Sequence, residues 1–304
     1  MRKVVPLVFI SGVAFAIASC SLFVDLDGLD DGGASDAGDE FCVCEDAGNG
    51  DAKVGDAADA STPLDAGINP CLDGGGTAGP RMIQADGYCI DSTEVTVGQY
   101  SDFLADGGNG VTNTGVCGWN LGFSPDVMGV GDPRCTAPNV DPTFRAQYPM
   151  TCINWCDAFA YCEWAGKRLC GAINGGGSVP FGSFSTNSQW YLACSTTAAD
   201  TYPNDSDDGG KCWLGHKSAG SVPVDSLGCN GGYPGLTDMV GNVEEWSDSC
   251  DTTGETDGGG PRRDYCHDEG DEFDENFSGQ GCTANDQDRR EETWSGIGFR
   301  CCSK

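Results

Sequence analysis

The chain has 304 residues, a formal net charge of −31, 47 glycines and 19 cysteines. This acidity excludes electrostatic binding of nucleic acids or anionic membranes, because their phosphates would be repelled. The excess of glycine, the sparse aliphatic residues and the many cysteines favour one loop-rich domain pinned by disulfides over a domain with a large aliphatic core.

The chain begins with a charged and then apolar leader. Met1, Arg2 and Lys3 precede an apolar stretch that is too short to span a membrane, so residues 1–19 are predicted to be a secretory signal peptide. The leader ends in Ile-Ala-Ser-Cys at Cys20, which resembles the bacterial lipobox, whose cysteine is diacylated and becomes the mature N-terminus. The resemblance implies a lipid anchor in the outer membrane, on its periplasmic or cell-surface side. An ordinary signal peptide followed by a core cysteine is the alternative.

Residues 20–68 consist mainly of Asp, Gly and Ala, with almost no aromatic residue. Such a segment cannot bury enough apolar surface to order itself, so a disordered acidic tether is predicted. Cys42 and Cys44 interrupt it, and disulfides to the domain are favoured over a soft-metal ligand pair, since no histidine is near. Residues 69–304 are predicted to form the domain.

The first part of the domain carries turn and helix-capping signals. Residues 81–84 and 88–91 are predicted strands around a glycine turn. Thr96 and Gln99 form a capping-box pattern, which predicts a helix with an apolar face. The residues expected on that face are Val97, Tyr100, Phe103 and Leu104. Residues 105–148 are rich in Gly, Asn, Asp and Pro and contain two cysteines, which predicts a long pinned loop.

Two further helices are expected. The spacing of Ala, Tyr, Cys and Trp over residues 158–169 is helical, with Gly166 as a stop, and a short helix is predicted over residues 186–194. Cys152, Cys156 and Cys162 lack the paired spacing of zinc ligands, so disulfides are favoured. The acidic run 268–275 is predicted to be a solvated loop or the lining of a cleft for a cationic ligand.

The stretch from Thr237 to Trp246 holds a Gly-Asn pair between short apolar runs, which indicates a turn. The carboxylates of Asp238 and Glu245 and the carbonyl groups of Gly241 and Val243 are oxygen ligands of the kind that a hard cation such as calcium requires. An ordinary turn without a metal is the alternative.

Four blocks in a fixed order, residues 90–100, 153–169, 236–246 and 296–301, resemble the sulfatase-modifying-factor, or formylglycine-generating enzyme, family. The resemblance covers about residues 80–302. It implies an α+β, C-type-lectin-like fold that is loop-rich and has little regular secondary structure. It also implies structural calcium bound by Asp238, Gly241, Val243 and Glu245, with Gly241 and Val243 acting through their main-chain carbonyl groups.

The enzymes of this family oxidise a substrate cysteine to formylglycine with O2 and a copper ion held by two cysteines. Glu275 and Gln280 stand at the matching positions here, and only Cys282 lies nearby. Because a two-coordinate soft-metal site needs two thiolates, we expect a binding or structural module with an unknown protein or small-molecule ligand. The alternative is an oxidase with a rearranged site, in which Cys282 is catalytic together with Cys266 or the Cys301 and Cys302 pair.

Overall fold

The computed structural model separates into two units, residues 1–62 and 63–304. The structure describes residues 71, 78–129, 131–173, 177–180, 187–195, 212, 220–226, 228–251, 264–273 and 281–303, all in the second unit. The predicted signal peptide, the lipidation site Cys20 and the cysteines Cys42 and Cys44 lie outside the described residues. No helix of the described part is long and apolar enough to cross a membrane.

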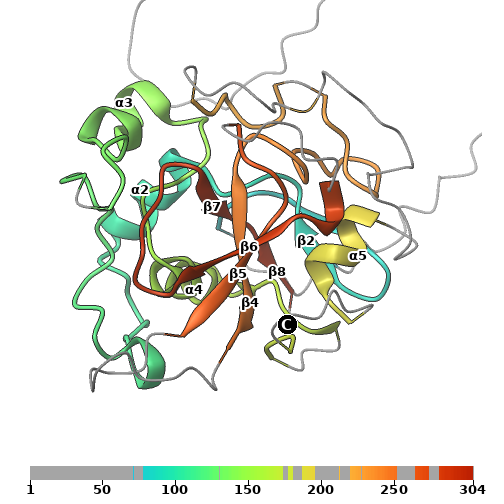
Figure 1. Ribbon diagram of the computed structural model, residues 1–304, viewed down its shortest axis with the longest axis horizontal. Helices are drawn as coiled ribbons and strands as arrows, with labels where there is room; N and C mark the ends of the chain where they lie inside the picture. The colour runs from blue at the N-terminus through green and yellow to red at the C-terminus, as the bar shows by residue number, and fades with distance from the viewer. Residues whose placement is uncertain are drawn as a thin grey trace, which may run out of the picture. The chain divides into compact units, whose positions relative to one another are not determined.

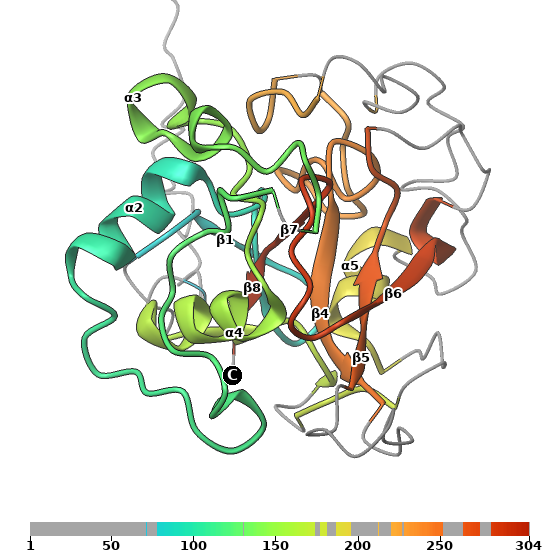
Figure 2. The ribbon, with the colours of Figure 1, turned by 60° about the vertical axis from the view of Figure 1, so that its left-hand side comes forward.

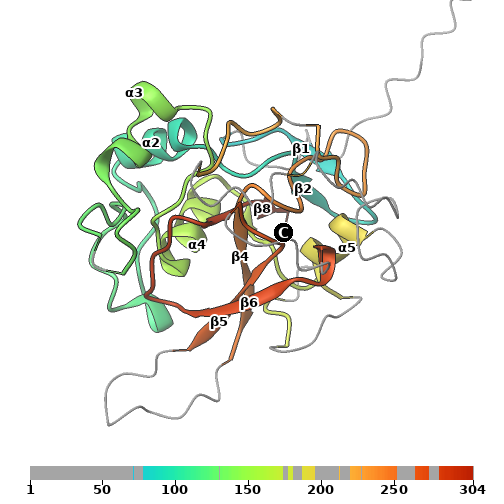
Figure 3. The ribbon, with the colours of Figure 1, turned by 45° about the horizontal axis from the view of Figure 1, so that its top comes forward.

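One four-stranded sheet joins the two ends of the domain. Its strands run in the order β1 (Met82–Gln84), β2 (Cys89–Asp91), β8 (Cys301–Cys302) and β3 (Arg168–Leu169), with each neighbouring pair antiparallel. The predicted hairpin of β1 and β2 is confirmed, and Gly87 in its turn has a φ of 84°. Figure 3 shows β2 and β8 close together, and Ile90 is directly paired with Cys302.

The second sheet has the order β6 (Asn285–Arg289), β5 (Tyr265–Glu269), β4 (Glu244–Cys250) and β7 (Ile297–Phe299). Strand β4 pairs antiparallel with β5 and parallel with β7, and β6 forms one edge (Figure 2). The prediction of a solvated loop over residues 268–275 is therefore wrong for its first two residues. Asp268 and Glu269 belong to β5 and are buried, because pairing with β4 and β6 covers them.

Helix α2 (Val97–Ala105) has the predicted capping box, in which Thr96 accepts a hydrogen bond from the amide of Gln99 and the Gln99 side chain accepts one from the amide of Thr96. Three of the four residues expected on its apolar face are buried. Leu104 is the exception, with 37% of its surface exposed, because it lies at the margin of the buried stripe.

Helix α4 (Trp155–Trp164) begins before the predicted position, because Asn154 and Asp157 form a second capping box. It ends at Trp164, and the predicted stop Gly166 follows with a φ of 72°, its amide donating to the carbonyl of Glu163. The short helix α5 (Gln189–Ser195) confirms the prediction for that segment. Both helices appear in Figure 1 on different sides of the strands.

The long segment 105–148 contains three short helices: η1 (Gly115–Cys117), η2 (Ala137–Val140) and α3 (Pro142–Arg145). Two disulfides pin it to the segment that enters α4, Cys117 to Cys156 and Cys135 to Cys152. The predicted pinned loop is thus confirmed, with short helical turns inside it.

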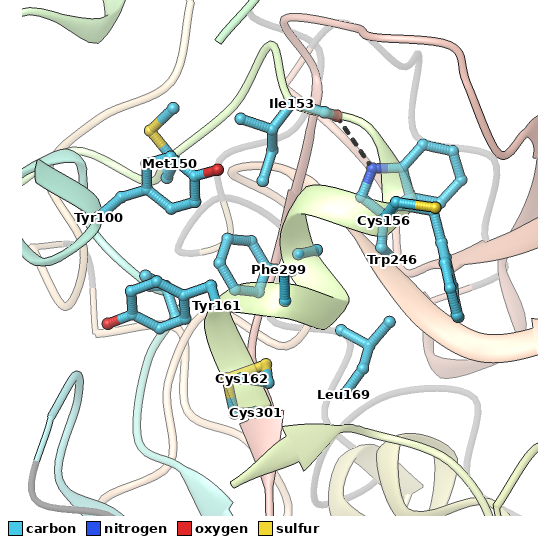
Figure 4. Packing of buried hydrophobic residues seen from close by; sticks show 14 of the residues in the cluster. Tyr100, Met150, Ile153, Cys156, Tyr161, Cys162, Leu169, Trp246, Phe299 and Cys301 are labelled. Atoms are coloured by element: carbon cyan, nitrogen blue, oxygen red, sulfur yellow. Dashed lines mark hydrogen bonds between the residues drawn. A yellow bond between two sulfur atoms is a disulfide. The ribbon is translucent and has the colours of Figure 1, made fainter. Parts of the chain in front are cut away.

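The main core lies between α2, α4 and the strand β7. Tyr100 stacks on Tyr161, and the ring of Phe299 meets Tyr161 edge-on. Trp246 is fully buried and donates a hydrogen bond from its indole nitrogen to the carbonyl of Ile153 (Figure 4). Aromatic rings therefore supply much of the buried apolar surface that the sparse aliphatic residues do not.

Eight disulfides pair all sixteen cysteines between residues 71 and 302. The bonds not yet named are Cys71–Cys89, Cys162–Cys301, Cys170–Cys302, Cys194–Cys282, Cys212–Cys229 and Cys250–Cys266. The prediction that Cys42 and Cys44 bond to the domain is corrected, because no cysteine of residues 71–302 is left for them. The preference for disulfides over zinc at Cys152, Cys156 and Cys162 is confirmed.

Candidate functional site

The predicted turn is present between Thr237 and β4. Asp238, Gly241 and Asn242 have φ values of 56°, 81° and 65°, in the left-handed region that Gly, Asn and Asp adopt most readily. The amide of Asp238 donates to the carbonyl of Cys229, and strand β4 then starts at Glu244. The turn is consequently held in a conformation that most residues resist.

Arg300 ties this turn to the end of the chain. Its guanidinium donates to both carboxylate oxygens of Glu245 at 2.6–2.9 Å, and Trp190 donates to the same carboxylate at 2.8 Å. The Nη2 atom of Arg300 also donates to the carbonyl groups of Thr237 and Asp238. Glu245 and Arg300 are both buried, so each needs the other to compensate for the loss of water.

Glu94 is a further acidic residue of the site, which the sequence analysis did not identify. It is fully buried, and its Oε1 atom accepts a hydrogen bond from Asn242, while its Oε2 atom has no hydrogen-bond partner among the described residues. Burial raises the pKa of Glu94 well above its usual range, and the charges of Asp238 and Glu245 raise it further. The sequence feature that could have identified Glu94 is its position in the block 90–100, close to the helix cap Thr96.

Oxygen donors and an excess of negative charge are gathered at this site. Glu94, Asp238 and Glu245 supply three carboxylates against the single guanidinium of Arg300, so two negative charges remain unbalanced if all are ionised. Burial raises the pKa of Asp238 to about 6. Oxygen atoms are the ligands that calcium prefers.

The arrangement also limits how calcium could be held. The Oδ2 atom of Asp238 accepts a hydrogen bond from the amide of Asp225 at 2.6 Å, and Glu245 is engaged by Arg300. Within the described residues, no group of three or more His, Cys, Asp or Glu side chains is arranged to hold a metal ion. A calcium ligand set must therefore include main-chain carbonyl groups, as predicted for Gly241 and Val243.

A second buried ion pair lies beside the site. Lys167 donates to Asp91 at 2.6 Å, and the other carboxylate oxygen of Asp91 accepts the amide of Cys301. Arg300 in turn donates to the carbonyl of Asp91. Strands β2 and β8 are thus joined to the turn through side chains as well as through the sheet.

Cys282 does not have the free thiol that a catalytic role requires. Its sulfur is bonded to that of Cys194, and the residue is fully buried in η5 (Gly281–Thr283). The other cysteines considered for a rearranged site, Cys266, Cys301 and Cys302, are also in disulfides. The expectation of a free nucleophile at these positions is corrected, because a disulfide sulfur has no thiolate form. Glu275 and Gln280 lie outside the described residues.

Comparison with known proteins identifies the family. The model of the sulfatase-modifying factor enzyme 1-like domain matches residues 49–304 and so starts within the segment predicted as a tether. The formylglycine-generating enzyme of Mus musculus is 24% identical over 297 residues, which cover 79% of this chain and 74% of the relative. The enzyme of Mycobacterium tuberculosis is 29% identical over 109 residues, 34% of each chain.

Solved structures with a similar arrangement include PvdO from Pseudomonas aeruginosa, with a TM-score of 0.46, 18% identity and coverage of 71% of this chain and 79% of the other. CarF has a TM-score of 0.45 at 18% identity and covers 71% and 86%. The loop-rich, disulfide-pinned α+β fold expected from the resemblance is confirmed. Since the family model matches most of its length, the chain belongs to the family of the sulfatase-modifying factor enzyme 1-like domain.

Proposed function

We propose that this protein is a lipid-anchored member of the family that acts as a binding or structural module and does not oxidise cysteine. One observation carries this proposal: the described domain cysteines are all in disulfides, while Glu275 and Gln280 stand where the copper-binding cysteines are expected. Copper bound by two ligands requires two thiolates, and neither a carboxylate nor an amide replaces them for a soft ion.

Copper binding and aldehyde formation test the proposal. The chain from residue 21 would be incubated with Cu(I), O2 and a cysteine-containing sulfatase peptide, with a formylglycine-generating enzyme as positive control. We expect no aldehyde in the peptide and no tight Cu(I) binding. The double variant Glu275→Cys with Gln280→Cys is the matched gain-of-ligand control and should bind Cu(I). Aldehyde formed by the unaltered chain would refute the proposal.

The alternative, an oxidase with a rearranged cysteine site, requires that the Cys194–Cys282 bond opens. Mass spectrometry of the unreduced protein, alkylated before digestion, separates the two functions. We expect Cys194 and Cys282 to be recovered as one linked peptide pair. Recovery of an alkylated Cys282 would support the oxidase.

The anchor is proposed at Cys20, in the outer membrane. The eight disulfides support an oxidising compartment outside the cytoplasm, where such bonds persist. Radiolabelled fatty acid should be incorporated into the unaltered protein. The variant Cys20→Ala should lose the label and be released from the membrane fraction, whereas equal labelling of both would contradict the anchor.

The calcium ion is proposed as a structural element of the module. Asp238, Glu245 and the carbonyl groups of Gly241 and Val243 would hold it, and Glu94 would contribute its buried charge. When bound, the ion would neutralise these carboxylates and fix the turn that leads into β4. It would take no part in chemistry, so its effect is expected on stability.

A further inference from the structure

Two aspartates, Asp268 on β5 and Asp288 on the edge strand β6, lie next to each other. In the antiparallel register of β5 and β6, Asp268 pairs with Asp286 and Cys266 pairs with Asp288. Because residues two apart on a strand point to the same face, Asp268 and Asp288 are diagonal neighbours on one face of the sheet. The two carboxyl groups face each other across the strand pair.

Asp268 has an unusual environment. It is fully buried, and neither of its carboxylate oxygens has a hydrogen-bond partner among the described residues. An ionised carboxylate that is buried without a donor is strongly unfavourable. Two ionised carboxylates cannot bond to each other, since both only accept, but a protonated carboxyl group can donate to a carboxylate. One proton would therefore satisfy both groups.

Among the described residues, only one neighbouring group compensates the pair, because a side-chain hydrogen bond with Trp294 lowers the pKa of Asp288. Across from Asp268 on β4 lies the neutral Trp246, and the charges that act on the pair are those of Asp286 on β6 and Glu292 in the turn after it. Both are negative. The arginine of that turn, Arg290, forms an ion pair with Asp264 at 2.9 Å and stacks on Trp155. A proton is thus the simplest positive charge available to the pair.

We propose that Asp268 and Asp288 share one proton in the folded protein, and that this hydrogen bond fastens the edge strand β6 to the sheet until rising pH removes the proton. Strand β6 begins directly after the segment of Cys282 and continues into the turn of Trp294, whose carbonyl accepts the amide of Cys152. Loss of the proton would loosen this whole connection, whereas acid would strengthen it.

The directions of the two pKa shifts agree with the proposed effect. Burial raises the pKa of Asp268 well above its usual range, and the charge of Asp288 raises it further, while burial raises the pKa of Asp288 to about 6. A carboxyl group with a raised pKa stabilises the fold fully below its unfolded pKa of about 4, and this contribution is lost as the pH rises through the folded pKa.

The experiment compares the pH dependence of unfolding in the full mature chain. If the folded protein holds one proton more than the unfolded chain, the unfolding equilibrium constant should rise about tenfold per pH unit. This rise should begin at about pH 4 and end when the pair has lost its proton. Other buried carboxyl groups add slope of the same sign, so the measurement is the difference between variants. In Asp268→Asn, the pH dependence of the unfolding free energy should be smaller by the amount due to one proton, because the asparagine amide donates to Asp288 at any pH. The control Asp286→Asn, an exposed neighbour on β6, should keep this slope but over a lower pH range, because the charge of Asp286 raises the pKa of Asp268.

In the unaltered chain, amide hydrogen exchange of residues 285–289 should accelerate with pH by more than the intrinsic exchange rate does. In Asp268→Asn it should follow the intrinsic rate. Equal slopes in the two proteins would overturn the proposal. If Asp268→Asn does not fold, infrared spectra provide the decision: the carbonyl intensity of protonated carboxyl groups at neutral pH must be lower by one group in Asp288→Asn than in the unaltered chain. Stabilisation by a divalent cation that requires Asp268 would also overturn it, in favour of a metal site.

Discussion

Arg300 and Glu245 form a buried ion pair in which the guanidinium donates to both carboxylate oxygens, at 2.6 Å in the shortest contacts. The pair joins Arg300, which lies between β7 and β8, to Glu245 on β4, and the two residues are 55 positions apart in the sequence. Removal of either partner leaves a buried charge without compensation, which is far more costly than the loss of an exposed pair.

We therefore expect Glu245→Ala to lower the free energy of unfolding by about 3–5 kcal/mol. Urea denaturation followed by tryptophan fluorescence measures this change. Arg134→Ala is the matched control, because Arg134 is 39% exposed and its buried partner Asp132 keeps the hydrogen bonds from the amide and the hydroxyl of Ser295. Its effect should be about 1 kcal/mol or less. Similar losses in both variants would show that Glu245 and Arg300 do not depend on each other.

Calcium should stabilise the protein after chelator treatment. At a calcium concentration about 100 times the dissociation constant, the gain in free energy of unfolding is expected to be about 2.7 kcal/mol, because only the folded state binds the ion. Thermal melts with and without calcium measure it. The variant Glu94→Gln should respond less, since it removes one of the buried charges. No response of the unaltered protein would leave the segment as a Gly-Asn turn without a metal.

A side chain at residue 241 should strain the turn. Gly241 has a φ of 81°, a conformation that costs other residues about 1–2 kcal/mol. Gly241→Ala is expected to lower stability by roughly that amount. Alanine at Gly122, which has open space around it and no positive φ, provides the comparison and should be nearly neutral. Equal effects would mean that the conformation of residue 241 adapts.

Asp157 should make stability depend on pH near neutrality. Burial raises its pKa to about 7, although the hydrogen bond from Asn120 opposes the shift. Since the folded pKa is raised, the stabilising contribution is complete below the unfolded pKa of about 4 and disappears as the pH rises through about 7. Thermal melts between pH 5 and 8 should therefore show a smaller slope for Asp157→Asn. An unchanged slope would mean that Asp157 stays ionised in the capping box.

The Cys194–Cys282 bond should contribute to stability and not to chemistry. It closes a loop of 88 residues, for which restriction of the unfolded chain predicts about 4–5 kcal/mol. The double variant Cys194→Ala with Cys282→Ala should lose about this much stability in urea unfolding. If the folded variant forms as much or as little aldehyde in the sulfatase peptide as the unaltered chain, Cys282 has no catalytic role in that reaction.

The features that local hydrogen bonds determine could be predicted from the sequence. The capping box of Thr96 and Gln99, the hairpin at Gly87 and the helix end at Gly166 each depend on a few neighbouring residues, and each is present. The Gly-Asn turn was found for the same reason. Its calcium ion stays a prediction.

Features that depend on distant residues could not be predicted in the same way. The acidic sequence of β5 is typical of a solvated loop, and only pairing with β4 and β6 buries Asp268 and Glu269. Cys194, the partner of Cys282, lies 88 residues earlier, so the spacing between Cys282 and its neighbouring cysteines could not predict this bond. Glu94 was missed because the three groups that surround it, Asn242, Asp238 and Glu245, come from a remote segment.

The pairing of β2 with β8 has a consequence for biogenesis. The two last cysteines, Cys301 and Cys302, bond to Cys162 and Cys170, which are 139 and 132 residues earlier, and Arg300 must reach Glu245. This core therefore cannot be assembled until residues 300–302 are available. Until then, Cys162 and Cys170 stay reduced or form other disulfides that are later exchanged. Premature termination near residue 299 would remove both covalent closures and the buried cation in one event.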